Sequence, residues 1–360
     1  MMLGSDARTR RRPARLAMAA LVPAALVASL WTSPQPSSAD ARIGASVGSR
    51  AGAEADSVRI AAAGDIACQA DPYGSSSPDN CQYDETSDLL VGKGFARVLA
   101  LGDNQYDVGA YSAYISFYDP WWGRVKRRTS PVPGNHEYDQ DPSATPTGYF
   151  RYFGDRVKGP DGLGYYSFDV PHDCTPGTGV CWHLIALSSE LCLGVGGCGP
   201  AADPADPAPG NRMYEWLKQD LAAHPQSTYP CTLAFWHHPL FSFSTASAGS
   251  AAIRPLWRAL YRADADVVLN GHSHNYQRWR PMTPGGRRDP GGIREFVVGT
   301  GGASRYALRS SVPANVVTAQ DRSFGILVLS LDADGYSWAW RTAAGQHRYR
   351  DAQTTAVACH

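Results

Sequence analysis

Residues 97–106 read RVLALGDNQY, an apolar run that passes directly into polar residues. A short apolar run that ends in glycine and aspartate is typical of a buried strand whose carboxyl end opens into a loop. Similar runs, each followed closely by Gly, Asp, Asn or His, lie at residues 58–63, 231–236 and 266–269. Helical patterns lie between the runs, at residues 85–95, 111–118, 212–223 and 251–261. Strands that alternate with helices predict a layered α/β fold with a largely parallel sheet.

The second half of the chain adds strand-like runs with tight connections, at residues 165–170, 182–187, 295–298, 324–331 and 336–340. A second, more antiparallel sheet would account for them. Gly- and Pro-rich surface excursions are expected at residues 191–210 and 281–292. No linker divides the chain, so we expect one domain at residues 56–350 and a C-terminal tail at residues 351–360.

Residues 1–39 have the pattern of an export signal, with an arginine-rich start, an apolar run and small residues before a plausible cut after Ala39. The apolar run, residues 16–31, is shorter than the roughly 20 residues of a spanning helix, so cleavage is favoured over a membrane anchor. We expect a secreted or cell-envelope protein with a flexible segment at residues 40–55 and no membrane span after signal removal. The export route is left open.

Composition allows a large core, because 43% of the 360 residues are hydrophobic and 18% are charged. The 33 basic and 33 acidic residues balance overall, but the arginines of the signal leave the remainder mildly acidic. Nothing in that balance indicates a nucleic-acid-binding surface.

The chain has eight cysteines, an even number that favours disulfides in an exported protein. A cysteine metal site is the alternative, but no two CxxC pairs occur to support it. Many pairings are possible, and short loops favour 68 with 81, 174 with 181, 192 with 198, and 231 with 359. The last of these would tie down the C-terminal tail.

Polar clusters follow the predicted strands. They are GDIA with Asp65, GDNQY with Asp103 and Tyr106, GNHE with Asn135 and His136, WHHP with His237 and His238, and GHSH with His272 and His274. Any one of them is readily explained as a turn, a helix cap or a structural histidine. Loops at the carboxyl ends of strands converge on one crevice, however, and carboxylate, phenolate, amide and imidazole together suit two metals of intermediate hardness. A glycine before a ligand would let the backbone approach a crowded site.

The ordered set GD, GDNQY, GNHE, a hydrophobic strand into His, and GHSHNY resembles the calcineurin-like metallophosphoesterases, specifically their purple acid phosphatase branch. The resemblance covers about residues 60–302 and includes NRMYEWLKQDL from Asn211 and VGTGG from Val298. It implies a four-layer α/β/β/α sandwich of two mixed sheets flanked by helices. It also implies that residues 56–350 form the catalytic domain.

The resemblance implies two groups of three ligands and one bridging ligand, which are Asp65, Tyr106 and His274; Asn135, His237 and His272; and Asp103. Many relatives have a histidine ligand in a GDxH motif, where this chain has Ala67, so Tyr106 would supply the missing ligand. A phenolate favours a hard trivalent ion, so we expect Fe(III) in the Tyr106 site and Zn, Fe or Mn in the second site.

The implied activity is hydrolysis of phosphate monoesters by a metal-bound hydroxide. His136 would stabilise the transition state or protonate the leaving oxygen, or else only support its neighbour Asn135 by a hydrogen bond. His238, Tyr276 and Arg278 are candidates for binding the substrate or supporting the ligands. Choosing His237 over His238 as ligand rests on the resemblance.

Two alternatives remain. The first is a phosphodiesterase or nucleotidase with the same metals, because the motifs do not encode the size of the leaving group. The second is a secreted binding protein that has the fold without catalysis, which retention of all the ligand positions argues against. The physiological substrate and the oligomeric state are not encoded in these motifs.

Overall fold

The computed structural model describes residues 57–360 apart from residues 70–80, 140–145 and 195, so the predicted signal and the segment at residues 40–55 lie outside the described residues. Its first sheet has the order β13-β12-β11-β1-β2-β3. The bounds are β1 (Val58–Ala63), β2 (Arg97–Leu101), β3 (Thr129–Val132), β11 (Gly325–Leu331), β12 (Gly335–Thr342) and β13 (Ala352–Ala358).

The second sheet has the order β10-β8-β9-β7-β6-β5-β4. Its strands are β4 (Tyr166–Val170), β5 (Trp182–Ala186), β6 (Thr232–Phe235), β7 (Val267–Asn270), β8 (Tyr276–Trp279), β9 (Arg294–Val298) and β10 (Val316–Gln320). The α-helices are α1 (Tyr83–Asp88), α2 (Tyr111–Ala113), α3 (Asn135–Tyr138), α4 (Thr147–Phe153), α5 (Glu190–Leu193), α6 (Pro209–Ala223) and α7 (Arg254–Arg262). Short turns of other helix types are η1 (Tyr114–Tyr118), η2 (Trp122–Arg128), η3 (Asp155–Val157) and η4 (Ala251–Ile253).

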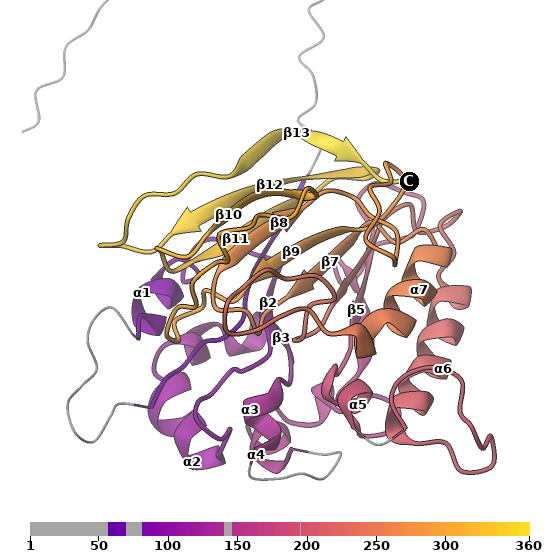
Figure 1. The fold of residues 1–360 in the computed structure, drawn as a ribbon, viewed down its shortest axis with the longest axis horizontal. Coiled ribbons are helices and arrows are strands. Elements are labelled where there is room, and N and C mark those ends of the chain that lie inside the picture. Colours follow the sequence, from indigo (N-terminus) through magenta and orange to yellow (C-terminus); the bar gives the residue numbers. More distant parts are fainter. Residues whose placement is uncertain (1–56, 70–80, 140–145, 195) are drawn as a thin grey trace, which may run out of the picture. The chain divides into compact units, whose positions relative to one another are not determined.

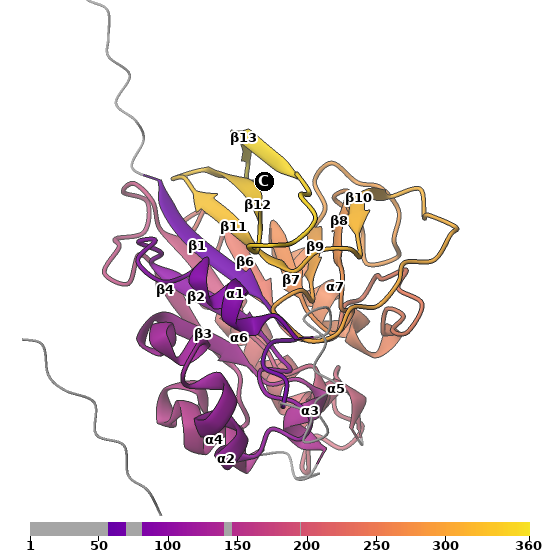
Figure 2. The same cartoon turned by 90° about the vertical axis from the view of Figure 1, so that its left-hand side faces the viewer.

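Strand β6 shows how the layers are built. Successive side chains of a strand point to opposite faces of the sheet. Leu233 and Phe235 lie in the large core shared with the first sheet, whereas Ala234 and Trp236 lie in a second core with residues of α6 and α7. Helices α1, α2 and α4 lie on the other side, beside β1, β2 and β3 (Figures 1 and 2). The expected four-layer fold with two mixed sheets is confirmed.

The division of strands between the sheets differs from the expectation. The first sheet is parallel on one side, through β1, β2 and β3, and the second is parallel at its centre, through β5, β6, β7 and β9. Antiparallel strands from the second half of the chain are added to both sheets, so they do not form a sheet of their own. The pattern of apolar residues could not assign β11 to a sheet, because this strand is buried on both faces.

Two predicted elements have other boundaries. The helix expected at residues 85–95 ends at Asp88, and Gly92 and Gly94 beyond it both have a φ of 71°. This left-handed backbone cannot continue a helix, and glycine adopts it at little cost. The expected C-terminal tail contains β13, which pairs antiparallel with β12.

All four expected disulfides are confirmed, between Cys68 and Cys81, Cys174 and Cys181, Cys192 and Cys198, and Cys231 and Cys359. The last one links the residue before β6 in the second sheet to the residue after β13 in the first. It therefore fastens the two sheets together at one end. None of the helices in the described part of the chain has the length and apolar character needed to cross a membrane.

Candidate metal centre

Each predicted ligand follows the carboxyl end of a parallel strand, in a loop or, for Asn135, at the first residue of α3. The ligands and the strands that precede them are Asp65 after β1, Asp103 and Tyr106 after β2, Asn135 after β3, His237 after β6, and His272 and His274 after β7. Two contacts join the sheets at this edge. The Gly64 N–H donates to the Val298 carbonyl at 2.9 Å, and His237 Nδ1 lies 2.9 Å from the Leu101 carbonyl oxygen. The loops of both sheets therefore meet at one place.

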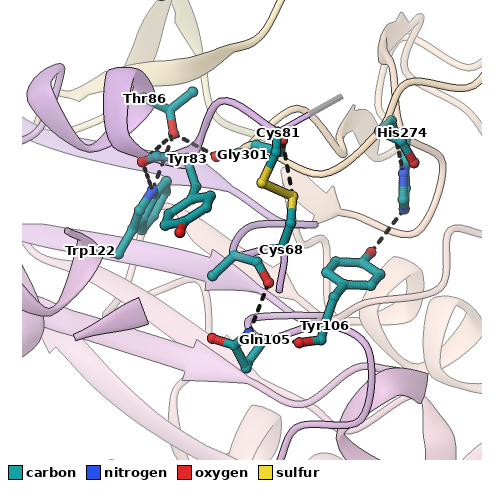
Figure 3. Close-up of a disulfide and its surroundings, with 12 residues drawn as sticks. Cys68, Cys81, Tyr83, Thr86, Gln105, Tyr106, Trp122, His274 and Gly301 are labelled. Atoms are coloured by element: carbon teal, nitrogen blue, oxygen red, sulfur yellow. Dashed lines mark hydrogen bonds between the residues drawn. A yellow bond between two sulfur atoms is a disulfide. The ribbon is translucent and has the colours of Figure 1, made fainter. Parts of the chain in front are cut away.

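A first group of donors surrounds the hydroxyl of Tyr106. This oxygen lies 3.1 Å from Asp65 Oδ1, 3.0 Å from Asp103 Oδ2 and 2.9 Å from His274 Nε2. His274 Nε2 is in turn 3.2 Å from Asp65 Oδ1, and all four residues are buried. Figure 3 shows Tyr106 pointing at His274, beside the Cys68–Cys81 disulfide.

A second group adjoins the first through Asp103. His237 Nε2 lies 3.2 Å from Asp103 Oδ2 and 3.2 Å from Asn135 Oδ1. The ring of His272 is centred 5.1 Å from that of His237, and its backbone N–H donates to Asp65 Oδ2 at 2.9 Å. Asp103 Oδ2 thus contacts a member of each group, as a bridging ligand must. The structure brings all seven expected ligands together.

Three of these ligands have a left-handed backbone. The φ angles are 61° at Asp65, 45° at Asp103 and 67° at His272. Such a conformation costs about 1–3 kcal/mol for a residue other than glycine and persists where the surroundings enforce it. Among the described residues, the other non-glycine position with a positive φ is Asp264, outside the centre. Backbone strain is therefore concentrated at the expected ligands.

Glycines allow this close approach. A Cβ on Gly134 would lie 2.3 Å from Asp103 Oδ1, and one on Gly102 would lie 2.6 Å from the His237 side chain. Neither contact is sterically possible, and Gly102 also has a φ of 87°. The expected use of glycine beside the ligands is confirmed at these two positions.

The two histidines of the second group differ in charge. Burial would lower the pKa of His237, but the Asp103 carboxylate beside it raises the pKa to about 10. Burial and the neighbouring His238 and His237 lower the pKa of His272 to about 2. Burial would raise the pKa of Asp103, yet His237 and His136 hold it below its usual range. In the absence of a cation, a proton on His237 is favoured by the Asp103 carboxylate 3.2 Å away.

Tyr106 is the group most sensitive to a missing cation. Burial and then the charges of Asp103 and Asp65 raise its pKa well above the ordinary value. A phenol in this setting gives up its proton only to a strong positive charge. Two carboxylates, a phenol, an amide and three imidazoles form a donor set that suits a pair of cations, with the hard oxygen donors gathered on one side.

His136 lies at the rim, where its side chain is 26% exposed. Its Nε2 is 3.9 Å from Asp103 Oδ2, its backbone N–H donates to Asp103 Oδ1 at 3.0 Å, and its ring is centred 4.3 Å from that of Tyr106. Burial lowers the pKa of His136, but Asp103, the Asp107 carbonyl and Asp139 together raise it. The residue is thus placed to hold a proton beside the cluster.

His238 extends the second group. Its ring is centred 3.9 Å from that of His272, and nitrogen atoms of His237, His238 and His272 lie within 4.8 Å of one another. Its Nδ1 lies 3.1 Å from Ser189 Oγ and 2.8 Å from Glu190 Oε1. The distance to Glu190 is that of an ion pair, but the alignment is not that of a hydrogen bond. His237, with its contacts to Asp103 and Asn135, has the position expected of the ligand.

Tyr276 and Arg278 are not placed as expected. The Tyr276 hydroxyl donates to Asp351 Oδ2 at 2.7 Å, and Arg278 forms two hydrogen bonds with the same carboxylate, at 2.8 and 2.9 Å. Both side chains therefore connect β8 to the start of β13. His274 is instead oriented through its Nδ1 by the Ser304 carbonyl. Tyr276 and Arg278 therefore contact Asp351 and not the expected ligands.

Sequence reasoning missed two supporting residues. Glu137 accepts hydrogen bonds from the N–H groups of Asn104, Gln105 and Gly134, at 2.9, 3.1 and 2.7 Å, and so joins the loops after β2 and β3. The sequence does indicate Glu137, because a Glu three residues after the residue that precedes a helix, here Gly134, is typical of a capping box. Tyr306 stacks on His274 at 3.9 Å with an angle of 6° between the rings. No motif marks Tyr306.

The chain is similar to phosphoesterases of known family. A family model described as calcineurin-like phosphoesterase matches residues 58–276. Purple acid phosphatase 15 of Arabidopsis thaliana is 31% identical over 193 residues, which is 51% of this chain and 32% of that protein. Purple acid phosphatase 22 of the same plant is 26% identical over 278 residues, covering 71% of this chain and 57% of that protein. The chain thus spans about a third to just over half of the length of these relatives.

A solved structure also resembles the chain. The purple acid phosphatase isolated from yellow lupin (Lupinus luteus) seeds superposes with a TM-score of 0.57 at 18% identity, covering 82% of this chain and 53% of that one. At this identity the likeness supports the fold alone.

Proposed function

Because the chain belongs to the calcineurin-like phosphoesterase family, we propose that it is a secreted phosphatase of the purple acid type that hydrolyses phosphate monoesters at a dinuclear metal centre. The observation that carries this proposal is the position of Asp103, whose Oδ2 is 3.0 Å from the Tyr106 hydroxyl and 3.2 Å from His237 Nε2. One carboxylate between two groups of donors is what a pair of cations requires.

Asp65, Tyr106 and His274 would hold one cation, with Asp103 as the bridge. The second cation would be held by Asn135, His237 and His272. Phenolate and carboxylate donors favour Fe(III) in the first position, and the imidazole-rich second position suits Zn, Fe or Mn. When bound, the cations lower the pKa of the attacking water and offset the negative charge on the phosphoryl oxygens.

His136 would supply the proton for the leaving oxygen. Its Nδ1 faces the Asp107 carbonyl oxygen, which leaves Nε2 directed towards the centre. The raised pKa keeps the imidazole protonated to a higher pH than a free histidine, so Nε2 can donate near neutral pH. His238, held by Ser189, would contribute to the wall beside the second group and contact the substrate.

Secretion is supported by the cysteines. All eight are paired in disulfides, and disulfides persist in oxidising compartments outside the cytosol. The arginine-rich start and the apolar run of residues 1–39 support the same proposal.

Metal loading is expected to release protons. With the pKa of His237 raised to about 10, the metal-free protein carries a proton on this imidazole near neutral pH, and the proton must leave before Nε2 can bind a cation. Metal affinity should therefore fall as the pH is lowered. Calorimetric titration with Zn²⁺ in two buffers of different ionisation enthalpy should show release of at least about one proton per centre. A proton count of zero, with an affinity independent of pH, would contradict the arrangement.

Substrate class is tested by comparing phenyl phosphate with diphenyl phosphate. The proposal expects faster turnover of the monoester, measured as kcat/KM on the metal-loaded protein. Preference for the diester would instead support the phosphodiesterase alternative. If neither ester reacts and the purified protein binds less than one metal ion per chain, the chain is a binding protein on this fold.

A further inference from the structure

A second polar site lies away from the metal centre, in the hairpin that follows β8. Residues 278–294 read RWRPMTPGGRRDPGGIR and contain five arginines and one aspartate. Arg278, Arg280, Arg288 and Arg294 line one surface hollow of about 330 Å³, which also contains Asp289. We call it the arginine hollow. None of its lining residues is an expected metal ligand.

Two of the arginines are fixed in place. The guanidinium groups of Arg278 and Arg294 lie 4.8 Å and 5.0 Å from the centre of the Trp338 ring. Arg278 forms a two-bonded ion pair with Asp351, whereas Arg294 Nε donates to the uncharged Tyr336 hydroxyl at 3.0 Å. One wall of the hollow is therefore preorganised, and the charge of Arg294 is not neutralised by this contact.

The side chains of the other two arginines, Arg280 and Arg288, have no charged partner among the described residues. Within the part of the chain that the structure describes, the side chains of Arg280 and Arg288 make no hydrogen bond or ion pair with the protein. The Asp289 carboxylate accepts the Tyr261 hydroxyl at 2.5 Å and the Gly291 N–H at 3.2 Å. Among the described residues, Arg278 is thus the lining arginine with a carboxylate partner. Arg280, Arg288 and Arg294, which line the same hollow, have no carboxylate partner among these residues.

Several guanidinium groups around one hollow favour the binding of an anion. Guanidinium groups bind phosphate oxygens through paired N–H donors, so the four lining arginines suit this geometry better than lysines would. The volume lies near the lower end of the roughly 300–1,000 Å³ of ligand pockets, which indicates a small ligand. We propose that the arginine hollow binds an anion that carries two or more linked phosphate groups. This inference does not depend on the proposed phosphatase activity.

The direct test is calorimetric titration of the full chain with sodium tripolyphosphate. Replacing Arg280 and Arg288 together by glutamine should weaken binding by about tenfold or more, because each substitution removes a charge-assisted hydrogen bond. The matched control is Arg287→Gln, since Arg287 belongs to the same hairpin and carries the same charge but does not line the hollow. Its affinity should stay within about twofold of wild type. Equal affinity in the R280Q/R288Q variant and wild type would overturn the proposal.

A second arm separates the hollow from the metal centre, which would also attract phosphates. The titration is repeated on the same chain after a chelator has removed metal ions. Binding at the hollow should persist there and should still be lost in the R280Q/R288Q variant. If all tripolyphosphate binding disappears with the metals, the proposal is wrong. Tripolyphosphate binding at the hollow does not require metal ions or phosphatase activity. This proposal and the proposed function can therefore fail independently.

A third arm identifies the part of the ligand that is recognised. If the hollow contacts only the phosphate groups, adenosine triphosphate should bind to the chelator-treated protein with about the same affinity as tripolyphosphate. Inorganic phosphate should bind at least about tenfold more weakly, since a single phosphate group accepts fewer charge-assisted hydrogen bonds than several linked groups do. Equal binding of phosphate and tripolyphosphate would contradict recognition of linked phosphates.

Discussion

Replacing Asp103 by asparagine is expected to reduce metal content from two ions per chain to one or fewer and to lower kcat/KM by about 10³-fold or more. The substitution removes the negative charge that lies between the two groups of donors, 3.0 Å from the Tyr106 hydroxyl and 3.2 Å from His237 Nε2. Asparagine has the same shape and tolerates the left-handed backbone at this position, so the loop should be retained. Metal analysis and steady-state kinetics with phenyl phosphate measure both effects.

The matched control is Asp264→Asn. Asp264 has a similar backbone, with a φ of 55°, but is exposed at the end of α7. This variant should retain the metal content and the rate of wild type. If D103N also retains both, Asp103 does not bridge two cations and the account of the centre is wrong.

Tyr106→Phe is expected to abolish the visible absorption of the iron-loaded protein. The colour would arise from charge transfer between the Tyr106 phenolate and Fe(III), and phenylalanine removes the oxygen while keeping the ring. Burial, Asp103 and Asp65 raise the pKa of this phenol well above its usual value, so its ionisation depends on a bound cation. The absorption spectrum and the iron content of the variant are the measurements.

Tyr306→Phe is the control for this experiment, because Tyr306 also contacts His274 but does so through its ring. The stacked ring is preserved in the variant, and the colour should remain. A coloured Tyr106→Phe protein, or a colourless Tyr306→Phe protein, would show that Tyr106 is not the phenolate ligand.

The meeting of the polar clusters at one place could be predicted from sequence because they follow parallel strands, whereas the choice of ligands within them rests on the family resemblance. A strand such as 97–101 fixes where its carboxyl end lies, and the polar residues after it must then face the same edge as those of its neighbours. Tyr276 and Arg278 lie outside the centre because the chain changes direction between the ligands and β8. His272 has a φ of 67° and β8 begins only at Tyr276, so the alternation of side chains does not carry from the ligands to Tyr276 and Arg278.

Long-range pairing accounts for the other differences. Strand β13 lies in the segment expected to be a tail tied by a disulfide, and five of its seven residues are exposed. Its hydrogen bonds come from β12, which sequence reasoning could not see. Tyr306 likewise contacts His274 because of how its loop folds, and no sequence motif marks this loop. Glu137 could have been identified, because it is the last residue of the GNHE motif and caps the helix that begins at Asn135.

The central claim is that seven side chains from five loops hold two cations side by side. Metal analysis of the purified mature protein, combined with its visible spectrum, tests this claim most directly. The account predicts two metal ions per chain, one of them iron, with a tyrosinate absorption band. A colourless protein with two zinc ions would remove the iron from the account but keep the centre. Less than one metal ion per chain, after exposure to iron and zinc, would contradict the claim itself.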